Sequence, residues 1–160
     1  MNVSAINIAA RRIGLISDTH DLLRPAAMEH MQGCDHIIHA GDICNEAVLE
    51  ELSAVAPVTA VRGNNDRGRW AEQLQEIVML EVNELLILVI HDLAQLKGRV
   101  MPAGVRVVIS GHSHKPSVRE VNGILYVNPG SAGRRRFKLP ISLGELLVSE
   151  EAVEARLIEL

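Results

Sequence analysis

The sequence is poor in aromatic residues and in cysteine. Aromatics make up 2% of its 160 residues, so the core must be built from Val, Ile, Leu, Ala and Met. The two cysteines, Cys34 and Cys44, are too few for a disulfide framework and lack the CxxC spacing of a thiolate metal site. A reducing compartment, the cytoplasm, is therefore the expected location.

Long apolar runs are also missing. The strongest run, Leu85–Ile90, is far too short to cross a bilayer, and no basic segment followed by a long apolar stretch opens the chain, so we expect neither a membrane anchor nor a signal peptide. The formal net charge of -4 argues against a broad nucleic-acid surface and against an anionic-membrane surface. The length predicts one domain, residues 1–160.

Short apolar runs recur along the chain, and a polar side chain directly follows most of them. We expect strands at residues 13–17, 36–40, 58–61, 77–82, 85–90 and 105–109. One helix should begin at Pro25, which suits a first helical turn, and another after Asn45, which can cap a helix that Pro57 ends. Early strands thus alternate with helices, which is typical of an α/β fold.

The later strands form hairpins. The first has Asn83-Glu84 at its turn, and the second has Asn122-Gly123, a strong type I′ turn signal. Asp92 resembles the start of a capping box that opens a short helix ending at Gly98. The alternating residues 153–157 predict an edge strand.

Side chains of metal-ligating type stand at these strand ends: Asp18, His20, Asp42, Asn64, His91, His112 and His114. Taken singly, each has a plain alternative, because Asp and Asn cap helices and occupy turns and a lone histidine is more often a hydrogen-bonded core residue. Taken together they are hard to explain as caps, because carboxylate, amide and imidazole groups all follow apolar runs. Loops at strand ends are where α/β folds place their chemistry.

Oxygen and nitrogen donors without thiolate suit Mn²⁺, Fe, Zn²⁺ or Ni²⁺ rather than a structural zinc site. The set exceeds what one ion needs. Two ions about 3.5–4 Å apart that share one carboxylate would use all of the donors, and that arrangement serves phosphoryl chemistry.

The ordered motifs resemble those of the calcineurin-like metallophosphoesterase superfamily, in particular its small, single-domain bacterial and archaeal phosphodiesterases. The resemblance runs from about Ile13 to the C-terminus and rests on these motifs: Asp18-Thr19-His20, Gly41-Asp42, Gly63-Asn64-Asn65-Asp66, His91, Gly111-His112-Ser113-His114 and Asn128-Pro129-Gly130-Ser131.

The resemblance implies a four-layer α/β/β/α sandwich with two mixed β-sheets. It assigns Asp18, His20 and His114 to a first metal and Asn64, His91 and His112 to a second, with Asp42 bridging both. Mn²⁺ is the expected ion, and Ni²⁺, Fe and Zn²⁺ also fit. A metal-bridging hydroxide, from a water whose pKa falls to about 7, would attack a phosphate ester in line. Asp42, Asn64 and His91 would thus be catalytic through the metals.

The sequence departs from the superfamily pattern at three positions. Larger members carry a histidine at the position of Asn65, where it can help the leaving group depart, and an amide cannot donate a proton as an acid does. Asp21 and Asp92 stand directly after His20 and His91, where many relatives have glycine. These two carboxylates could be simple caps or could hold the histidine rings.

The expected substrate is a small phosphodiester or phosphomonoester, held by Asn64 and by Arg135. The segment Arg134-Arg135-Arg136 could clamp a phosphate or could be a solvated loop. A homo-oligomer is left open. The alternative function is a catalytically weak or inactive protein-binding scaffold on the same fold, like the retromer subunit that this subgroup resembles. A metal-binding sensor or chaperone is a third hypothesis for the function.

Overall fold

Two mixed β-sheets pack face to face in the computed structural model, which describes residues 4–160. The six-stranded sheet has the order β1 (Ala5–Ile8), β5 (Ile77–Val82), β6 (Leu85–Ile90), β7 (Val105–Ile109), β9 (Ile124–Asn128) and β8 (Ser117–Val121). The five-stranded sheet has the order β11 (Val153–Glu159), β10 (Ser142–Val148), β2 (Arg12–Ile16), β3 (His36–His39) and β4 (Val58–Ala60). The expected sandwich of two mixed sheets is therefore confirmed.

Aliphatic side chains from both sheets form the central core. Ile13 and Ile38 of one sheet share a buried cluster with Leu80, Ile87 and Ile109 of the other. No aromatic residue belongs to this cluster. The prediction that branched and unbranched aliphatic residues build the core is correct.

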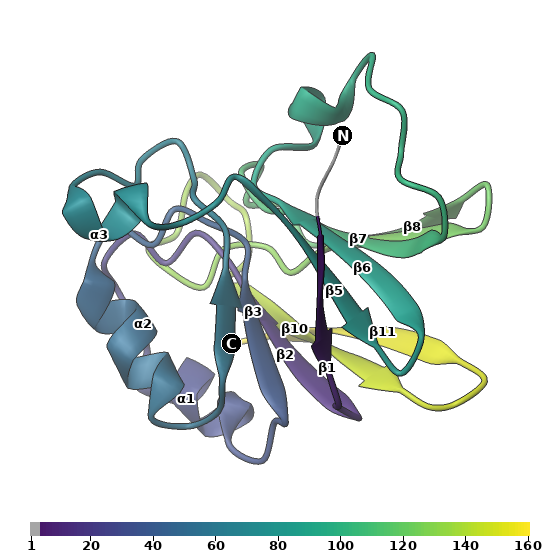
Figure 1. Cartoon of the computed structure of the whole chain (residues 1–160). Helices are drawn as coiled ribbons and strands as arrows, with labels where there is room; N and C mark the ends of the chain where they lie inside the picture. Colours follow the sequence, from purple (N-terminus) through teal and green to yellow (C-terminus); the bar gives the residue numbers. More distant parts are fainter. Residues whose placement is uncertain (1–3) are drawn as a thin grey trace.

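Three helices cover the outer face of the five-stranded sheet (Figure 1): α1 (Pro25–Met31), α2 (Glu46–Ser53) and α3 (Arg69–Glu72). Met31 of α1 and Leu52 of α2 are buried against Ile16 and Ile37 of the sheet. Pro25 opens α1, and Asn45 caps α2 by accepting a hydrogen bond from the Ala47 amide, as the sequence predicts.

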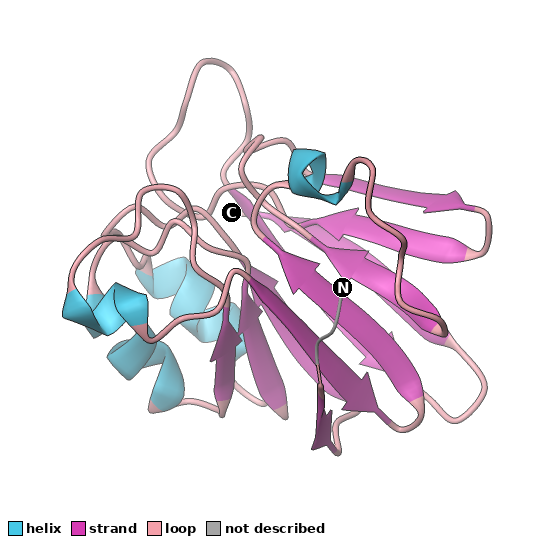
Figure 2. Ribbon diagram, turned by 45° about the horizontal axis from the view of Figure 1, so that its top comes forward, coloured by secondary structure: helices cyan, strands magenta, loops and turns pink. Residues whose placement is uncertain are grey.

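The outer face of the six-stranded sheet is covered by less structure. Only the 3-10 helix η1 (Leu93–Leu96) lies over it in the described residues, on the opposite side of the sandwich from α1–α3 (Figure 2). Leu93 and Leu96 pack there with Met101, on the segment that follows η1. The fourth layer is thus a single 3-10 turn and a loop, shorter than the helix expected between Asp92 and Gly98.

Both predicted hairpins form. Asn122 and Gly123 have φ values of 51° and 78°, as a type I′ turn requires. The predicted edge strand is β11. Strands β1 and β10 and helix α3 were not predicted from the sequence. In the described residues no helix is long and apolar enough to cross a membrane.

Candidate metal centre

The loops that follow five strands meet at one end of the sandwich. Backbone hydrogen bonds join them: Asp18 N donates to Gly41 O, His20 N donates to Asp42 O, and Gly111 N donates to His91 O. These bonds bring the loops after β2, β3, β6 and β7 into contact. All seven predicted ligands lie on these loops or on the loop after β4.

A first group of ligand atoms comes from the loops after β2 and β7. Asp18 Oδ1 lies 3.2 Å from His114 Nε2 and 3.8 Å from His20 Nε2, and the two imidazole nitrogens are 3.4 Å apart. Ligands about 2.1 Å from one ion and 90–110° apart are separated by about 3.0–3.4 Å. Two of the three distances fall in this range, and all three atoms lie close enough together to hold one ion.

A second group comes from the loops after β4, β6 and β7. Asn64 Oδ1 lies 3.0 Å from His91 Nε2 and 3.2 Å from His112 Nδ1. His112 thus turns Nδ1 toward this group, while His114, two residues later, turns Nε2 toward the first. The one-residue gap between the histidines lets their rings turn toward different groups.

Asp42 lies between the two groups. Its Oδ2 is 3.6 Å from His20 Nε2 in the first group and 3.4 Å from His91 Nε2 in the second. Asp18 also approaches the second group, because its Oδ1 is 3.9 Å from His91 Nε2. Asp18, Asp42 and His91 accordingly form another set of atoms close enough to hold one ion.

The backbone at most of these ligands is in the left-handed region, which residues other than glycine rarely adopt. The positive φ values are 53° at Asp18, 44° at His20, 57° at Asp42, 69° at His112 and 62° at His114. Such conformations cost free energy and are typical of functional sites. The close approach of the loops also requires Gly111, because a Cβ there would collide with Ser17 and the Asp18 carboxylate.

Hydrogen bonds orient the Asp18 carboxylate so that one oxygen is left over. Oδ2 accepts hydrogen bonds from the Ser17 hydroxyl at 2.6 Å and from His112 N at 3.0 Å. Oδ1 is buried and accepts none from a described residue. A buried carboxylate oxygen without a donor is costly unless a cation takes its lone pairs. The residues present therefore fit divalent metal ions at this site.

Asp42 is held by residues on the loop after β4. Asn65 donates its backbone N–H to Asp42 Oδ1 and its side-chain amide to Oδ2, both at 2.9 Å. Asp66 supports the backbone of the Asp42 loop: its buried carboxylate accepts hydrogen bonds from the amides of Asp42, Ile43, Cys44 and Gly63. Asp66 belongs to the motif Gly63-Asn64-Asn65-Asp66, but no local sequence pattern indicates this role.

The charges of this cluster support one another. Burial opposes ionisation of Asp18, yet the nearby imidazoles of His114 and His20 lower its pKa below the ordinary value. Burial likewise opposes ionisation of Asp42, while His91 and Asn65 bring its pKa to about 2. Burial disfavours a charged His91, but Asp42 raises its pKa overall. Both carboxylates are therefore anionic near neutral pH and available to cations.

The outer nitrogens of three rings contact other groups of the protein. His91 Nδ1 lies 2.7 Å from Ala40 O, which directs Nε2 of that ring toward the cluster. His112 Nε2 lies 3.7 Å from Asp92 Oδ2, and His20 Nδ1 lies 3.6 Å from Cys44 Sγ. A hydrogen bond such as that between His91 and Ala40 fixes the tautomer and orientation of a ligating imidazole, and Asp92 and Cys44 lie beside the other two rings.

The remaining candidates lie outside the cluster. His39 is buried between the Thr19 hydroxyl and the Gly41 amide. Asp21 accepts a hydrogen bond from the Asn45 side chain and contacts no imidazole of a described residue. Arg135 lies in an exposed loop.

The cluster opens to solvent on the side of the second group. Asn64 and His112 are exposed, whereas Asp18, Asp42, His91 and His114 are buried. A small cleft of about 210 Å³ adjoins His112 and is lined in part by Asp92, Arg119 and Tyr126. A larger cleft lies apart from these ligands, around Ala10, Asp35 and Asn83, and none of the seven ligands lines it.

The chain is similar to known proteins in both sequence and fold. Residues 12–151 match the calcineurin-like phosphoesterase superfamily domain. A "probable metallophosphoesterase" of Methanocaldococcus jannaschii is 37% identical over 159 residues, which cover 91% of this chain and 80% of that protein. A solved archaeal phosphodiesterase superposes with a TM-score of 0.78 at 28% identity, over 93% of this chain and 99% of that chain. Vps29 of Chaetomium thermophilum has the same fold, with a TM-score of 0.74 at 19% identity over 94% and 99% of the two chains.

Proposed function

The chain belongs to the calcineurin-like phosphoesterase superfamily, and we propose that it is a phosphodiesterase with a dinuclear metal centre. In this proposal the whole chain, residues 1–160, is one catalytic domain that acts in the cytoplasm, where the free thiols of Cys34 and Cys44 stay reduced. The substrate class is a small phosphodiester, and the reaction is direct in-line hydrolysis.

The observation that carries the proposal is the position of Asp42 Oδ2 between two sets of ligand atoms. We assign Asp18, His20 and His114 to one ion and Asn64, His91 and His112 to the other, with Asp42 as the shared carboxylate. In each group two ligand-atom distances, between 3.0 and 3.4 Å, suit coordination to one ion. A carboxylate between two such groups is the expected element of a dinuclear centre.

Divalent cations at these positions would neutralise the charge on phosphate and activate water as the nucleophile. The protein supplies the preorganisation. The Ala40 carbonyl holds the His91 ring, and the Ser17 hydroxyl turns Asp18 so that Oδ1 faces the cluster. These groups are already in place before substrate binds, so little reorganisation is needed during the reaction.

The exposed side of the cluster is where we place the substrate. Asn64 is at the opening and could contact a phosphate oxygen, and Arg135 on the exposed loop could contact another. Mn²⁺ is our preferred ion because the donors are oxygen and nitrogen, although Ni²⁺, Fe and Zn²⁺ accept the same donors. The archaeal phosphodiesterase among the similar structures supports a diester as substrate.

The similarity to Vps29 is compatible with a second candidate, a protein-binding scaffold on the same fold. We favour the enzyme because all seven expected ligand positions hold a residue able to bind metal and converge in space. A scaffold has no need to keep an orphaned buried carboxylate oxygen such as Asp18 Oδ1.

The test is hydrolysis of bis-p-nitrophenyl phosphate by the Mn²⁺-loaded protein, with elemental analysis of the same sample. We expect turnover with two ions per chain, no turnover by Asp42→Ala, and one ion per chain in His112→Ala and in His114→Ala. His30→Ala, on the exposed face of α1, is the control. Two bound ions without turnover of any diester or monoester would refute the enzyme and leave the scaffold or a metal sensor.

A further inference from the structure

The most basic segment of the chain is an exposed loop beside the candidate metal centre. Arg134, Arg135, Arg136 and Lys138 are four of the sixteen Lys and Arg residues, and no Asp or Glu occurs between Glu120 and Glu145. All four cations are exposed, and none pairs with a carboxylate within the described residues. The segment Arg134–Lys138 is called the basic loop below.

The basic loop carries the most exposed large hydrophobic side chain of the described residues. Phe137 is 92% exposed, whereas Trp70 and Tyr126, the other two aromatic residues, are partly buried. Burying a Phe side chain stabilises a fold, and the exposed Phe137 contributes almost nothing of this kind. An aromatic ring placed among four cations is available instead to a ligand with both negative charge and an apolar face.

The loop is anchored to the backbone of the first ligand motif. The Ser131 hydroxyl donates to Asp18 O at 2.9 Å, and Ala132 N donates to Ser17 O at 3.1 Å. Gly133 lies so close to the carbonyls of Asp18 and Thr19 that a Cβ there would collide with both. The basic loop therefore begins one residue after a direct contact with the backbone that carries two proposed ligands.

The other end of the loop is fixed as well. Ile141 forms a β-bridge with Ser131, and Ser142 N donates to Ser131 O at 2.9 Å. Arg24 Nη2 donates to Gly133 O at 3.2 Å. Both ends of the basic loop are therefore held next to Ser131. The loop begins and ends at the rim of the metal centre and cannot move far from it.

We propose that the basic loop binds single-stranded nucleic acid and presents its phosphodiesters to the metal centre. This inference rests on the proposed function and extends its substrate class from small phosphodiesters to oligonucleotides. The arginines would contact phosphates, and Phe137 would stack on a base, which is how proteins hold single strands without reading their sequence. The rest of the chain is net acidic, so this binding is confined to the loop.

An anionic membrane is the competing ligand for a basic loop with one aromatic ring. Membrane association by such a segment needs a wide apolar face or a second anchor. The described residues of the loop offer Phe137 as their one large exposed apolar side chain. The loop is also attached to the proposed phosphoesterase centre. This attachment favours nucleic acid, a polymer of phosphodiesters, over a membrane as the ligand.

The first experiment measures binding alone, with metal-free protein and a short fluorescein-labelled oligothymidylate followed by fluorescence anisotropy. We expect Phe137→Ala to weaken binding roughly tenfold, since stacking on one base contributes about 1–3 kcal/mol. We expect the triple variant Arg134→Ser, Arg135→Ser, Arg136→Ser to weaken it further and to reduce the slope of log Kd against log salt by about 2, at about 0.7 per phosphate contact.

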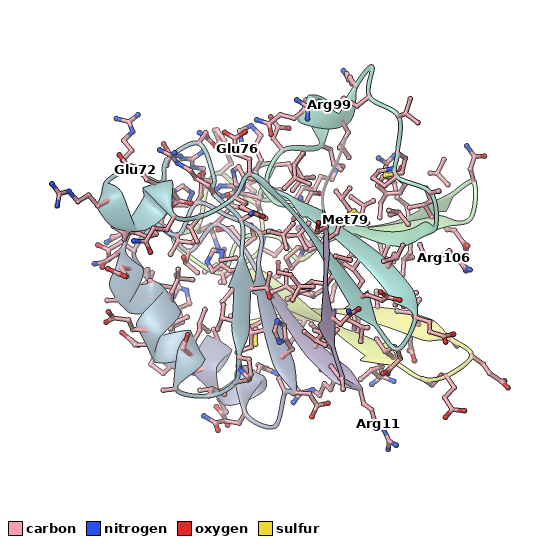
Figure 3. The ribbon with its side chains drawn as sticks, in the orientation of Figure 1. Arg11, Glu72, Glu76, Met79, Arg99 and Arg106 are labelled. Atoms are coloured by element: carbon pink, nitrogen blue, oxygen red, sulfur yellow. The ribbon has the colours of Figure 1, made fainter. Side chains whose placement is uncertain are left out.

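A second triple variant with the same net charge is the matched control. Arg11, Arg99 and Arg106 are exposed and lie at separate edges of the molecule (Figure 3). Their joint replacement by Ser should leave the affinity and the salt slope within about twofold of the wild type. If both triple variants lose affinity equally, binding depends on net charge alone and the assignment to the basic loop is wrong.

The second experiment compares hydrolysis of the unlabelled oligonucleotide with that of bis-p-nitrophenyl phosphate by Mn²⁺-loaded protein. Phe137→Ala should lower the ratio of the two kcat/KM values about tenfold. Failure to hydrolyse the small diester refutes the proposed function, whereas an unchanged ratio and unchanged oligonucleotide affinity refute the role of the loop. Sedimentation with phosphatidylglycerol vesicles, without oligonucleotide binding, would show that the ligand is a membrane and overturn the inference.

Discussion

Asp92 faces the outer ring nitrogen of His112. Its Oδ2 lies 3.7 Å from Nε2, while Nδ1 of the same ring lies 3.2 Å from Asn64 Oδ1. Asp92 Oδ1 also accepts a hydrogen bond from Ala94 N at 3.0 Å and so caps η1. One residue thus combines the two roles that the sequence left open for it, a helix cap and a partner for the histidine ring.

Replacing Asp92 by Asn should weaken metal binding at the group that contains His112. Asn retains the cap but removes the charge that holds the imidazole, and loss of such a partner typically costs about 10–100-fold in metal affinity. We expect a drop of about tenfold for the weaker of two Mn²⁺ sites in calorimetric titration, with little change in Tm.

Asp21→Asn is the matched control for this substitution. Asp21 also directly follows a proposed histidine ligand, but its carboxylate contacts the Asn45 side chain instead of an imidazole. Its Mn²⁺ affinities should stay within about twofold of the wild type. Equal losses in both variants would mean that Asp92 acts through general charge and not on His112.

The buried carboxylate of Asp66 should be the most sensitive position outside the ligands. It accepts four backbone hydrogen bonds, three of them from residues 42–44. Asn would turn an N–H₂ group toward these donors and leave at least one unpaired. We expect Asp66→Asn to lower the free energy of unfolding by about 3 kcal/mol in urea denaturation and to abolish the site shared through Asp42.

Asp35→Asn is the comparison for Asp66. Asp35 also accepts two backbone amides, from Arg11 and Arg12, but it is exposed and far from the ligands in the fold. Its replacement should cost under about 1 kcal/mol and leave metal binding intact. A similar loss of metal in both variants would point to global destabilisation.

Sequence patterns located the residues of the candidate site more readily than the edges of the fold. The proposed ligands stand at the ends of buried apolar runs, and such runs form strands where they pair. The junctions at Asp18, Asp42 and His91 are therefore visible in the sequence. The strand β1 was not, because it has four residues and depends on parallel pairing with β5. The strand β10 was missed although it is almost fully buried, because its run is interrupted by Gly144 and Glu145.

The role of Asp66 could not be predicted from the sequence, for a different reason. A buried Asp after Gly63-Asn64-Asn65 looks like an ordinary turn residue, and nothing in the local pattern reveals that the amides of residues 42–44 converge on it. Contacts between loops of distant strands depend on the assembled sheets. The helix of the fourth layer is shorter than predicted for a related reason. The cap at Asp92 indicates where a helix begins but not how many residues it contains.

Asn65 should make hydrolysis depend steeply on the leaving group. Its side chain is engaged with Asp42 Oδ2, and an amide cannot protonate a departing oxygen. With a series of substituted phenyl diesters, log kcat should fall steeply as the pKa of the leaving phenol rises. Asn65→His should flatten this dependence, with the largest gain for the poorest leaving group. An unchanged slope would mean that another group donates the proton.

The buried histidine His39 should make the metal-free protein less stable in acid. Burial lowers its pKa to about 3 from an ordinary 6.5. Between these two pH values His39 is protonated in the unfolded chain but neutral in the folded chain. Above pH 6.5 the neutral His39 ring causes no loss of stability. As the pH falls below 6.5 the free energy of unfolding declines, and at pH 3 it is lower by roughly 4 kcal/mol. Asp18 and Asp42 act in the same direction but only below their ordinary pKa of 3.8, so the interval from pH 6.5 to 4 isolates histidine.

His39→Gln is the variant that tests this, because the amide can still hydrogen-bond but does not titrate in this range. The difference in unfolding free energy between wild type and variant, measured in urea at several pH values, should shrink by about 1.4 kcal/mol per pH unit on going from pH 6 to pH 4. His30→Gln, on the exposed face of α1, should show no such change with pH. A constant difference for His39→Gln would mean that the ring is accessible to protons in the folded state, and that the contacts of Thr19 and Gly41 with it do not keep it neutral.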